Sequence, residues 1–238
     1  MITVGDAEME QRRIRAALDA GVSDPQVLTW HYASPAVVLG RGQRPTAEVL
    51  ERAEGEHLAV VTRSSGGGAV VTGPWMLSFT LLLPAVHPLA KASLPVGYRA
   101  VGEACRGVLN RFRLPTEIAG HTAATGADGA LRANELGWAC FADVSHGELV
   151  AVGGRKVVGL SQVRRRDAIA VCIGVLLSRP NWEVLLRVWQ GWVDPKLVQQ
   201  FEDRTATCVQ LASPNEGPSP VQLAAALEAE LPVLDIAA

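Results

Sequence analysis

Cysteine is scarce in this chain, which has four in 238 residues, at positions 105, 140, 172 and 208. None of them forms a CxxC pair, and four scattered thiols are too few for the disulfide framework of a small secreted domain. Structural zinc needs clustered cysteine or histidine ligands, which this spacing does not provide. The sequence therefore predicts no metal site, and each cysteine has to be judged by its neighbours.

Long apolar runs and an excess of one charge are also absent. No stretch approaches the roughly eighteen apolar residues of a membrane-spanning helix, and residues 1–15 lack the basic start and apolar core of a secretory signal. Lysines and arginines number 22 against 24 aspartates and glutamates, a net charge of −2. No overall basic field favours nucleic acid or an anionic membrane, so we expect a cytoplasmic protein that binds neither.

The chain does have enough apolar residues for a packed core, at 48% with 19% charged. Apolar spacing and capping residues predict helices at 7–20, 47–53, 101–112, 184–192 and 220–231. Short apolar runs predict strands at 27–32, 36–39, 58–62, 76–83, 148–152, 156–160 and 169–177. There is no internal repeat, and the one linker-like stretch, "ASPNEGPSP", leaves no room for a second domain. We expect one α+β domain over residues 1–238.

Residues 63–73, "RSSGGGAVVTG", are the most unusual segment. Three consecutive glycines lack Cβ atoms, so they turn sharply and expose backbone N–H groups to an anion or a polarised carbonyl. A mobile hairpin connection is the alternative interpretation. Because two predicted strands lead into this loop, we favour a binding role.

Cys140 differs from the other three cysteines in its surroundings. It follows a long polar segment, 115–137, and functional groups are often presented at the ends of such loops. By contrast, Cys105 lies in the apolar stripe of a helix, Cys172 lies within "IAVCIGVLL", and Cys208 has no charged neighbours. These three are predicted to be core residues. His146 is close to Cys140 in sequence, but "VSHGE" is more typical of a surface turn.

Three blocks together resemble the lipoate-protein ligase A and octanoyltransferase family, whose catalytic domain is related to that of biotin-protein ligases. Gly40, Arg41 and Gln43 match its G-R-x-Q block, and residues 63–70 match R-R-x-S-G-G-G-A-V with Thr62 in place of the first arginine. Residues 154–162 match G-R-K-h-x-G-x-x-Q, where h is apolar. Members that take acyl groups from a thioester have a Cys-Phe pair upstream of the lysine, as Cys140-Phe141 stands sixteen residues before Lys156.

The resemblance implies a mixed, mostly antiparallel sheet flanked by helices, and an enzyme that attaches octanoyl or lipoyl groups to a lysine of a lipoyl carrier domain. The carrier would belong to a 2-oxoacid dehydrogenase or be a glycine cleavage H-type protein, and an acyl carrier protein is a candidate donor. Cys140 would accept the acyl chain, and Lys156 would stabilise the oxyanion. The implied substrate-binding residues are Arg41, Arg63, Ser65, Gly66, Gly67, Gly68, Ala69, Ser78, Gly159 and Ser161.

The sequence departs from the ligase branch of the family at two blocks. Residues 72–76 replace the usual H-D-x-G-N, and residues 172–175 replace a later H-H-G-T. The chain also ends too soon after Lys156 for the accessory carboxyl-terminal domain of the longer ligases. These differences favour thioester transfer without a cofactor. An ATP- and Mg-dependent ligase acting through lipoyl-AMP, and a non-catalytic acyl-binding protein, remain the alternatives.

Overall fold

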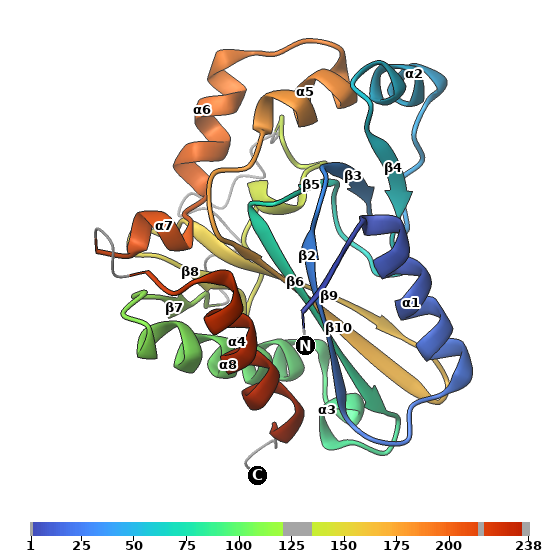
Figure 1. The fold of residues 1–238 in the computed structure, drawn as a ribbon, viewed down its shortest axis with the longest axis vertical. Coiled ribbons are helices and arrows are strands. Elements are labelled where there is room, and N and C mark those ends of the chain that lie inside the picture. The colour runs from blue at the N-terminus through green and yellow to red at the C-terminus, as the bar shows by residue number, and fades with distance from the viewer. Residues whose placement is uncertain (1, 121–134, 214–216, 235–238) are drawn as a thin grey trace.

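The computed structural model describes residues 2–120, 135–213 and 217–234 (Figure 1). Most of the polar segment expected at 115–137 therefore lies outside the described residues. Within these ranges, no helix is both long and apolar enough to cross a membrane.

Seven strands form the main sheet, in the order β1-β2-β6-β10-β9-β8-β7. The β1–β2 pair is parallel, and the other pairs of this sheet are antiparallel. The expected α+β fold with a mixed, mostly antiparallel sheet is confirmed. The strands are β1 (Thr3–Gly5), β2 (Gln26–Tyr32), β6 (Met76–Pro84), β7 (Glu117–Ile118), β8 (Leu149–Val150), β9 (Lys156–Arg164) and β10 (Ala168–Leu176).

Strand β6 is buried along its whole length because both faces of the sheet are covered. Leu77, Phe79 and Leu81 pack against helices α4 (Leu94–Arg111) and α8 (Pro220–Glu230) on one face. On the other face, Leu82 packs against α1 (Ala7–Ala20). Alternate side chains of a strand point to opposite faces, so this one strand contributes to both layers of the core.

A second, three-stranded sheet of order β4-β3-β5 stands beside the main one. Its strands are β3 (Ala36–Leu39), β4 (Ala59–Thr62) and β5 (Val70–Thr72), and α2 (Ala47–Gly55) connects β3 to β4. The Thr46 hydroxyl caps α2 by accepting from the Val49 N–H, as a threonine before a helix predicts. The sequence indicated the first two strands but not that they leave the main sheet.

Two helices with aromatic side chains, α5 (Trp182–Gln190) and α6 (Pro195–Arg204), pack near the small sheet. Trp182 and Phe201 stack with their ring centroids 4.5 Å apart. The expectation that the first helix runs on to Trp192 is wrong, because Gly191 adopts a left-handed conformation, φ 92°, and ends it. Trp192 lies beyond the helix and is 62% exposed. The short helices α3 (Pro88–Lys91) and α7 (Cys208–Leu211) were not expected.

The glycine loop is packed tightly against the turn that follows β3. A Cβ atom on Gly40 would stand 1.8 Å from the Gly67 carbonyl oxygen, and one on Gly68 would stand 2.4 Å from the Trp138 carbonyl oxygen. Gly67 itself has φ 97°, a conformation that side chains disfavour. These glycines therefore allow backbone segments of the same chain to approach one another.

This packing predicts that Gly40→Ala lowers the free energy of unfolding by about 1–3 kcal/mol, the usual range for overpacking a rigid site. Gly42→Ala is the matched control, because a Cβ there would meet nothing within 4 Å. The control should be neutral or slightly stabilising, since alanine restricts the unfolded chain. Urea denaturation of both variants checks the prediction, and equal stabilities would contradict it.

Candidate functional site

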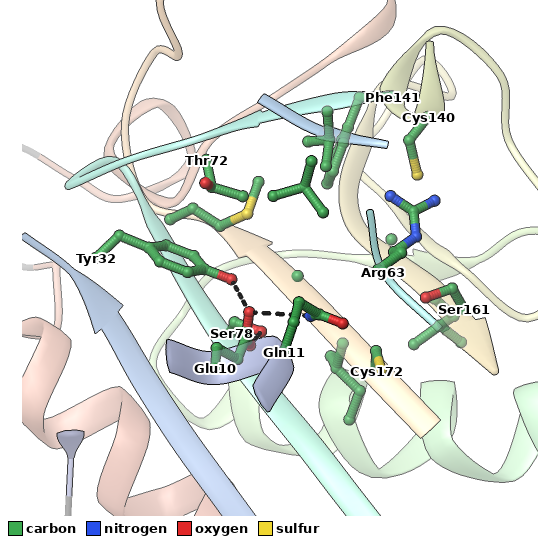
Figure 2. A pocket seen from close by; sticks show the side chains of 17 residues that line it. Glu10, Gln11, Tyr32, Arg63, Thr72, Ser78, Cys140, Phe141, Ser161 and Cys172 are labelled. Carbon is green, nitrogen blue, oxygen red and sulfur yellow. Dashed lines mark hydrogen bonds between the residues drawn. The ribbon is translucent and has the colours of Figure 1, made fainter. Parts of the chain in front are cut away.

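A pocket lies between the two sheets and the first turns of α1 (Figure 2). Its floor is the main sheet, where Gly159 of β9 pairs with Gly174 of β10, which in turn pairs with Ser78 of β6. Two facing glycines remove side chains from adjacent strands and so hollow the sheet surface. Val38, Val70 and Thr72 of the small sheet line the opposite side, and Glu10 and Gln11 of α1 close a third.

Cys140 lines this pocket and is half-buried. It begins a short 3₁₀ turn, η2 (Cys140–Ala142), and its N–H donates to the Ala69 carbonyl at 2.7 Å. The Ala69 N–H in turn donates to the Trp138 carbonyl at 2.7 Å. Ala69, which follows the three glycines, is thus hydrogen-bonded to the residues before and after Ala139. These two bonds fix Cys140 at the pocket.

Aromatic stacking supports the same segment from behind. The Trp138 ring stacks on the Trp189 ring with centroids 4.8 Å apart. The Trp138 backbone carbonyl also accepts a hydrogen bond from the Gln43 side-chain amide at 2.9 Å, and the Gln43 side-chain oxygen accepts one from the Gly40 N–H at 3.0 Å. The G-R-x-Q block therefore positions the cysteine segment through Gln43, while the Arg41 side chain is exposed.

Lys156 is 1% exposed and forms an ion pair with Glu148, with Nζ and Oε2 2.7 Å apart. Its ammonium also donates to the carbonyls of Cys140, at 2.9 Å, and Asp143, at 3.0 Å. An ammonium has three N–H groups, and these contacts use all of them. An oxyanion contact would require the ammonium to exchange one of these bonds.

Glu148 is equally buried and makes two further contacts. It accepts from the backbone N–H of Ser145 at 2.7 Å and of Leu160 at 2.9 Å. The carboxylate thus connects the segment after Cys140 to strand β9. Lys156 lies just outside the pocket lining, beside Phe141, with Nζ 5.0 Å from the ring centroid.

Arg63 is buried and lines the pocket. Its guanidinium donates to the Gly66 carbonyl, at 3.1 and 2.8 Å, and to the Gly68 carbonyl, at 2.9 Å, so the glycine loop is wrapped around it. Ser65 bonds the hydroxyl of Ser161, with the two oxygens 2.8 Å apart. The loop is therefore tied both to its own arginine and to the floor strand β9.

Five of the residues predicted for the site line this pocket, namely Arg63, Ser78, Cys140, Gly159 and Ser161. The others stand behind or beside its lining, namely Arg41, Ser65, Gly66, Gly67, Gly68, Ala69 and Lys156. His146 is also outside the lining. The three sequence blocks converge in space, but several of their residues support the pocket wall instead of facing the cavity.

The sequence predicted Ser78 for the site but not its partners Glu10 and Tyr32, which form a polar cluster with it on the side of the pocket away from Cys140 (Figure 2). The Glu10 carboxyl accepts from the Ser78 hydroxyl at 2.5 Å and from the Tyr32 hydroxyl at 2.7 Å. Burial raises the pKa of Glu10 above its ordinary value, although these hydrogen bonds oppose the rise. Burial, and then the charge of Glu10, raises the pKa of Tyr32. The signal was present, because Glu10 shares the buried helix face of Ile14 and Leu18.

Burial makes the other three cysteines poor nucleophiles. Burial raises the pKa of Cys105 and Cys208 to about 12, and burial with the nearby Glu10 raises that of Cys172 to about 11. The thiolate is the reactive form, so these three thiols stay protonated near neutral pH. The expectation that Cys172 is a core residue is wrong in part, because its side chain lines the pocket. Among the described residues, no three His, Cys, Asp or Glu side chains are grouped to hold a metal ion.

Proteins named octanoyltransferase LipM are similar to this chain. That of Exiguobacterium sp. is 29% identical over 150 residues, which are 63% of this chain and 53% of the relative. That of Anoxybacillus flavithermus is 25% identical over 200 residues, which are 82% of this chain and 70% of the relative. The chain thus spans about half the length of the first of these relatives.

Solved structures share the fold at low sequence identity. A crystal structure of lipoate-protein ligase A bound with ATP has a TM-score of 0.68 at 17% identity, covering 95% of this chain and 80% of that one. A bi-partite lipoate protein ligase from Thermoplasma acidophilum, in a study with its E2 lipoyl domain, has a TM-score of 0.68 at 16% identity, covering 95% and 78%. The sequence matches the lipoyl protein ligase A/B catalytic domain over residues 8–221, which confirms the resemblance of the three blocks: the chain belongs to this family.

Proposed function

We propose that this protein is an acyltransferase that moves an octanoyl group from a thioester donor to a lysine of a lipoyl carrier domain, with Cys140 as the intermediate acceptor. The observation that carries the proposal is the position of Cys140. Its side chain is half-buried and lines a pocket whose floor and opposite side are largely apolar, whereas burial keeps the thiols of the other three cysteines protonated. The octanoyltransferase relatives support the acyl group.

In the first step, the Cys140 thiolate attacks the carbonyl carbon of the donor thioester. A new C–S bond forms, the C–S bond of the donor breaks, and the donor thiol leaves with the proton that Cys140 released. In the second step, the amine of the acceptor lysine attacks the Cys140 thioester. The amide C–N bond forms, the C–S bond to Cys140 breaks, and the proton that the amine loses restores the cysteine thiol. Both steps balance without ATP or Mg.

Lys156 and Glu148 serve this reaction by holding η2, the turn that begins at Cys140 and is called the cysteine turn below. The ammonium binds the carbonyls of Cys140 and Asp143, at either end of η2, and Glu148 anchors that ammonium to β9. Fixing a nucleophile relative to its substrate removes much of the entropic barrier, and a displacement of about 1 Å can slow a reaction roughly 10²-fold. The oxyanion role implied for Lys156 by the family remains a further proposal.

The acceptor is a lipoyl domain of a 2-oxoacid dehydrogenase or a glycine cleavage H-type protein, and an acyl carrier protein is the candidate donor. The E2 lipoyl domain studied with the Thermoplasma acidophilum ligase supports this class of acceptor. ATP-dependent ligation through lipoyl-AMP is the alternative, because a lipoate-protein ligase with the same fold binds ATP. In that reaction Cys140 would take no part.

Incubation of the protein with an octanoylated carrier protein, without ATP, should add one octanoyl group that hydroxylamine removes. Peptide mass spectrometry should locate the group on Cys140. Cys140→Ser should abolish the adduct and the transfer, because a serine hydroxyl is scarcely ionised near neutral pH. Cys172→Ser is the matched control, since this thiol lines the same pocket, and it should keep the adduct. Transfer that requires ATP and survives loss of the Cys140 thiol would establish the ligase reaction instead.

Lys156→Met should lower the free energy of unfolding by about 3–5 kcal/mol, because it leaves the buried Glu148 carboxylate without its cation. The double variant Lys156→Met, Glu148→Gln should regain most of this stability, since it buries no unpaired charge. Octanoyl transfer by the double variant should still fall by about 10²-fold, because the cysteine turn loses its donor. Denaturation and transfer rates measured on the same samples separate the two effects. A stable double variant with a normal rate would assign the pair to folding alone.

A further inference from the structure

The polar cluster of Glu10, Tyr32 and Ser78 is unexpected in a pocket for an acyl chain. Its hydrogen bonds are 2.5 Å from Ser78 to Oε1 and 2.7 Å from Tyr32 to Oε2, and Gln11 adds a longer one at 3.4 Å. Glu10 is 3% exposed, yet it lines the cavity. Because this carboxyl group is buried and its oxygens are already hydrogen-bonded, it would limit the length of an apolar chain in the pocket without binding it.

The sheet register places this cluster at a defined distance from the cysteine turn. Phe141, next to Cys140, covers Gly159 of β9, where an added Cβ would stand 3.2 Å from Phe141 Cζ. Gly159 pairs with Gly174, and Gly174 pairs with Ser78. Neighbouring strands are about 4.8 Å apart, so Ser78 lies roughly 10 Å across the sheet from Gly159.

An eight-carbon acyl chain fits this span. Its seven C–C bonds, each about 1.5 Å long, extend over roughly 9 Å in a zigzag. The Phe141 ring packs over both glycines of the floor and itself lines the pocket. A chain that starts at the cysteine turn and runs along this ring toward β6 therefore ends where Ser78 and Tyr32 hold the Glu10 carboxyl. A longer chain would have to displace that carboxyl from its hydrogen bonds.

We propose that Glu10, fixed by Ser78 and Tyr32, is the end wall of the acyl pocket and determines the length of the acyl chain that the protein accepts. This inference rests on the proposed function, because it assigns the acyl chain to this pocket. Glu10 touches the far end of the chain and takes no part in bond making. It is a specificity-determining residue and not a catalytic one.

The test compares kcat/KM for hexanoyl, octanoyl, decanoyl and dodecanoyl carrier protein. Glu10→Ala removes the carboxyl and opens space for about two methylene groups, each worth roughly fourfold when buried. The ratio of decanoyl to octanoyl kcat/KM should therefore rise about fifteenfold. Ser78→Val adds bulk at the same end and should shift the preference the other way, toward hexanoyl.

Two control variants separate an end wall from a general structural role. Glu10→Gln keeps the size of the side chain and can still accept hydrogen bonds, so it should retain the preference for octanoyl. Glu8→Ala removes an exposed carboxylate of the same helix, one that pairs with Arg12 at the surface, and should leave the profile unchanged. If Glu10→Ala and Ser78→Val lowered the rates for all chains alike, the chain-length role would be overturned.

Binding of the free fatty acids, measured by the shift in melting temperature, makes the inference independent of turnover. The unaltered protein should be stabilised most by octanoate, and Glu10→Ala should be stabilised most by decanoate. If the protein binds fatty acids in this pattern but transfers no acyl group, the proposed function is wrong and the role of Glu10 as the end wall is retained. Equal stabilisation of both proteins by every fatty acid would reject the end wall, whatever the outcome of the transfer assay.

Discussion

Backbone contact at the glycine loop is the constraint on which the site depends. Gly40 meets the carbonyl of Gly67, and Gly68 meets that of Trp138, at distances that leave no space for a Cβ atom. This approach brings the Ala69 carbonyl within hydrogen-bonding distance of the Cys140 N–H. Of the three glycines that first suggested a ligand-binding loop, Gly67 and Gly68 thus let backbone segments of the protein approach one another, whereas Gly66 is exposed and a Cβ there would meet nothing within 4 Å.

The sequence predicted most of the helices and strands because their signals are local. Asp6, Thr46 and Ser219 each cap the helix that follows, and the apolar run of β6 fits a strand covered on both faces. The division into two sheets could not be predicted, because strands 36–39 and 59–62 pair with each other through long-range packing that no local pattern records. Helix α6 was missed although Asp194 and Pro195 have the cap and first-turn chemistry of a helix start.

For the site, the sequence blocks come together around one pocket, but the sequence does not reveal the direction of each side chain. Five of the predicted residues line this pocket, and their roles there stay predictions: Arg63, Ser78, Cys140, Gly159 and Ser161. Lys156 forms a buried ion pair with Glu148, which also accepts hydrogen bonds from two backbone N–H groups. Sequence spacing reveals neither the burial of this pair nor those hydrogen bonds. Glu10 lies near the amino end of the chain, far in sequence from Cys140, so only the folded structure shows that both residues border one cavity.

The paired glycines of β9 and β10 also bear on the thermodynamics of binding. The hollow they create is part of a hydrogen-bonded ladder between two long strands, so its floor is set when the sheet forms, and the Phe141 ring packs over that floor. An acyl chain entering a preformed trough loses its own conformational entropy but imposes little ordering on the protein. Preorganisation of this kind makes the pocket selective for shape and favours binding of a chain that fits, because the protein loses little conformational entropy when the chain enters.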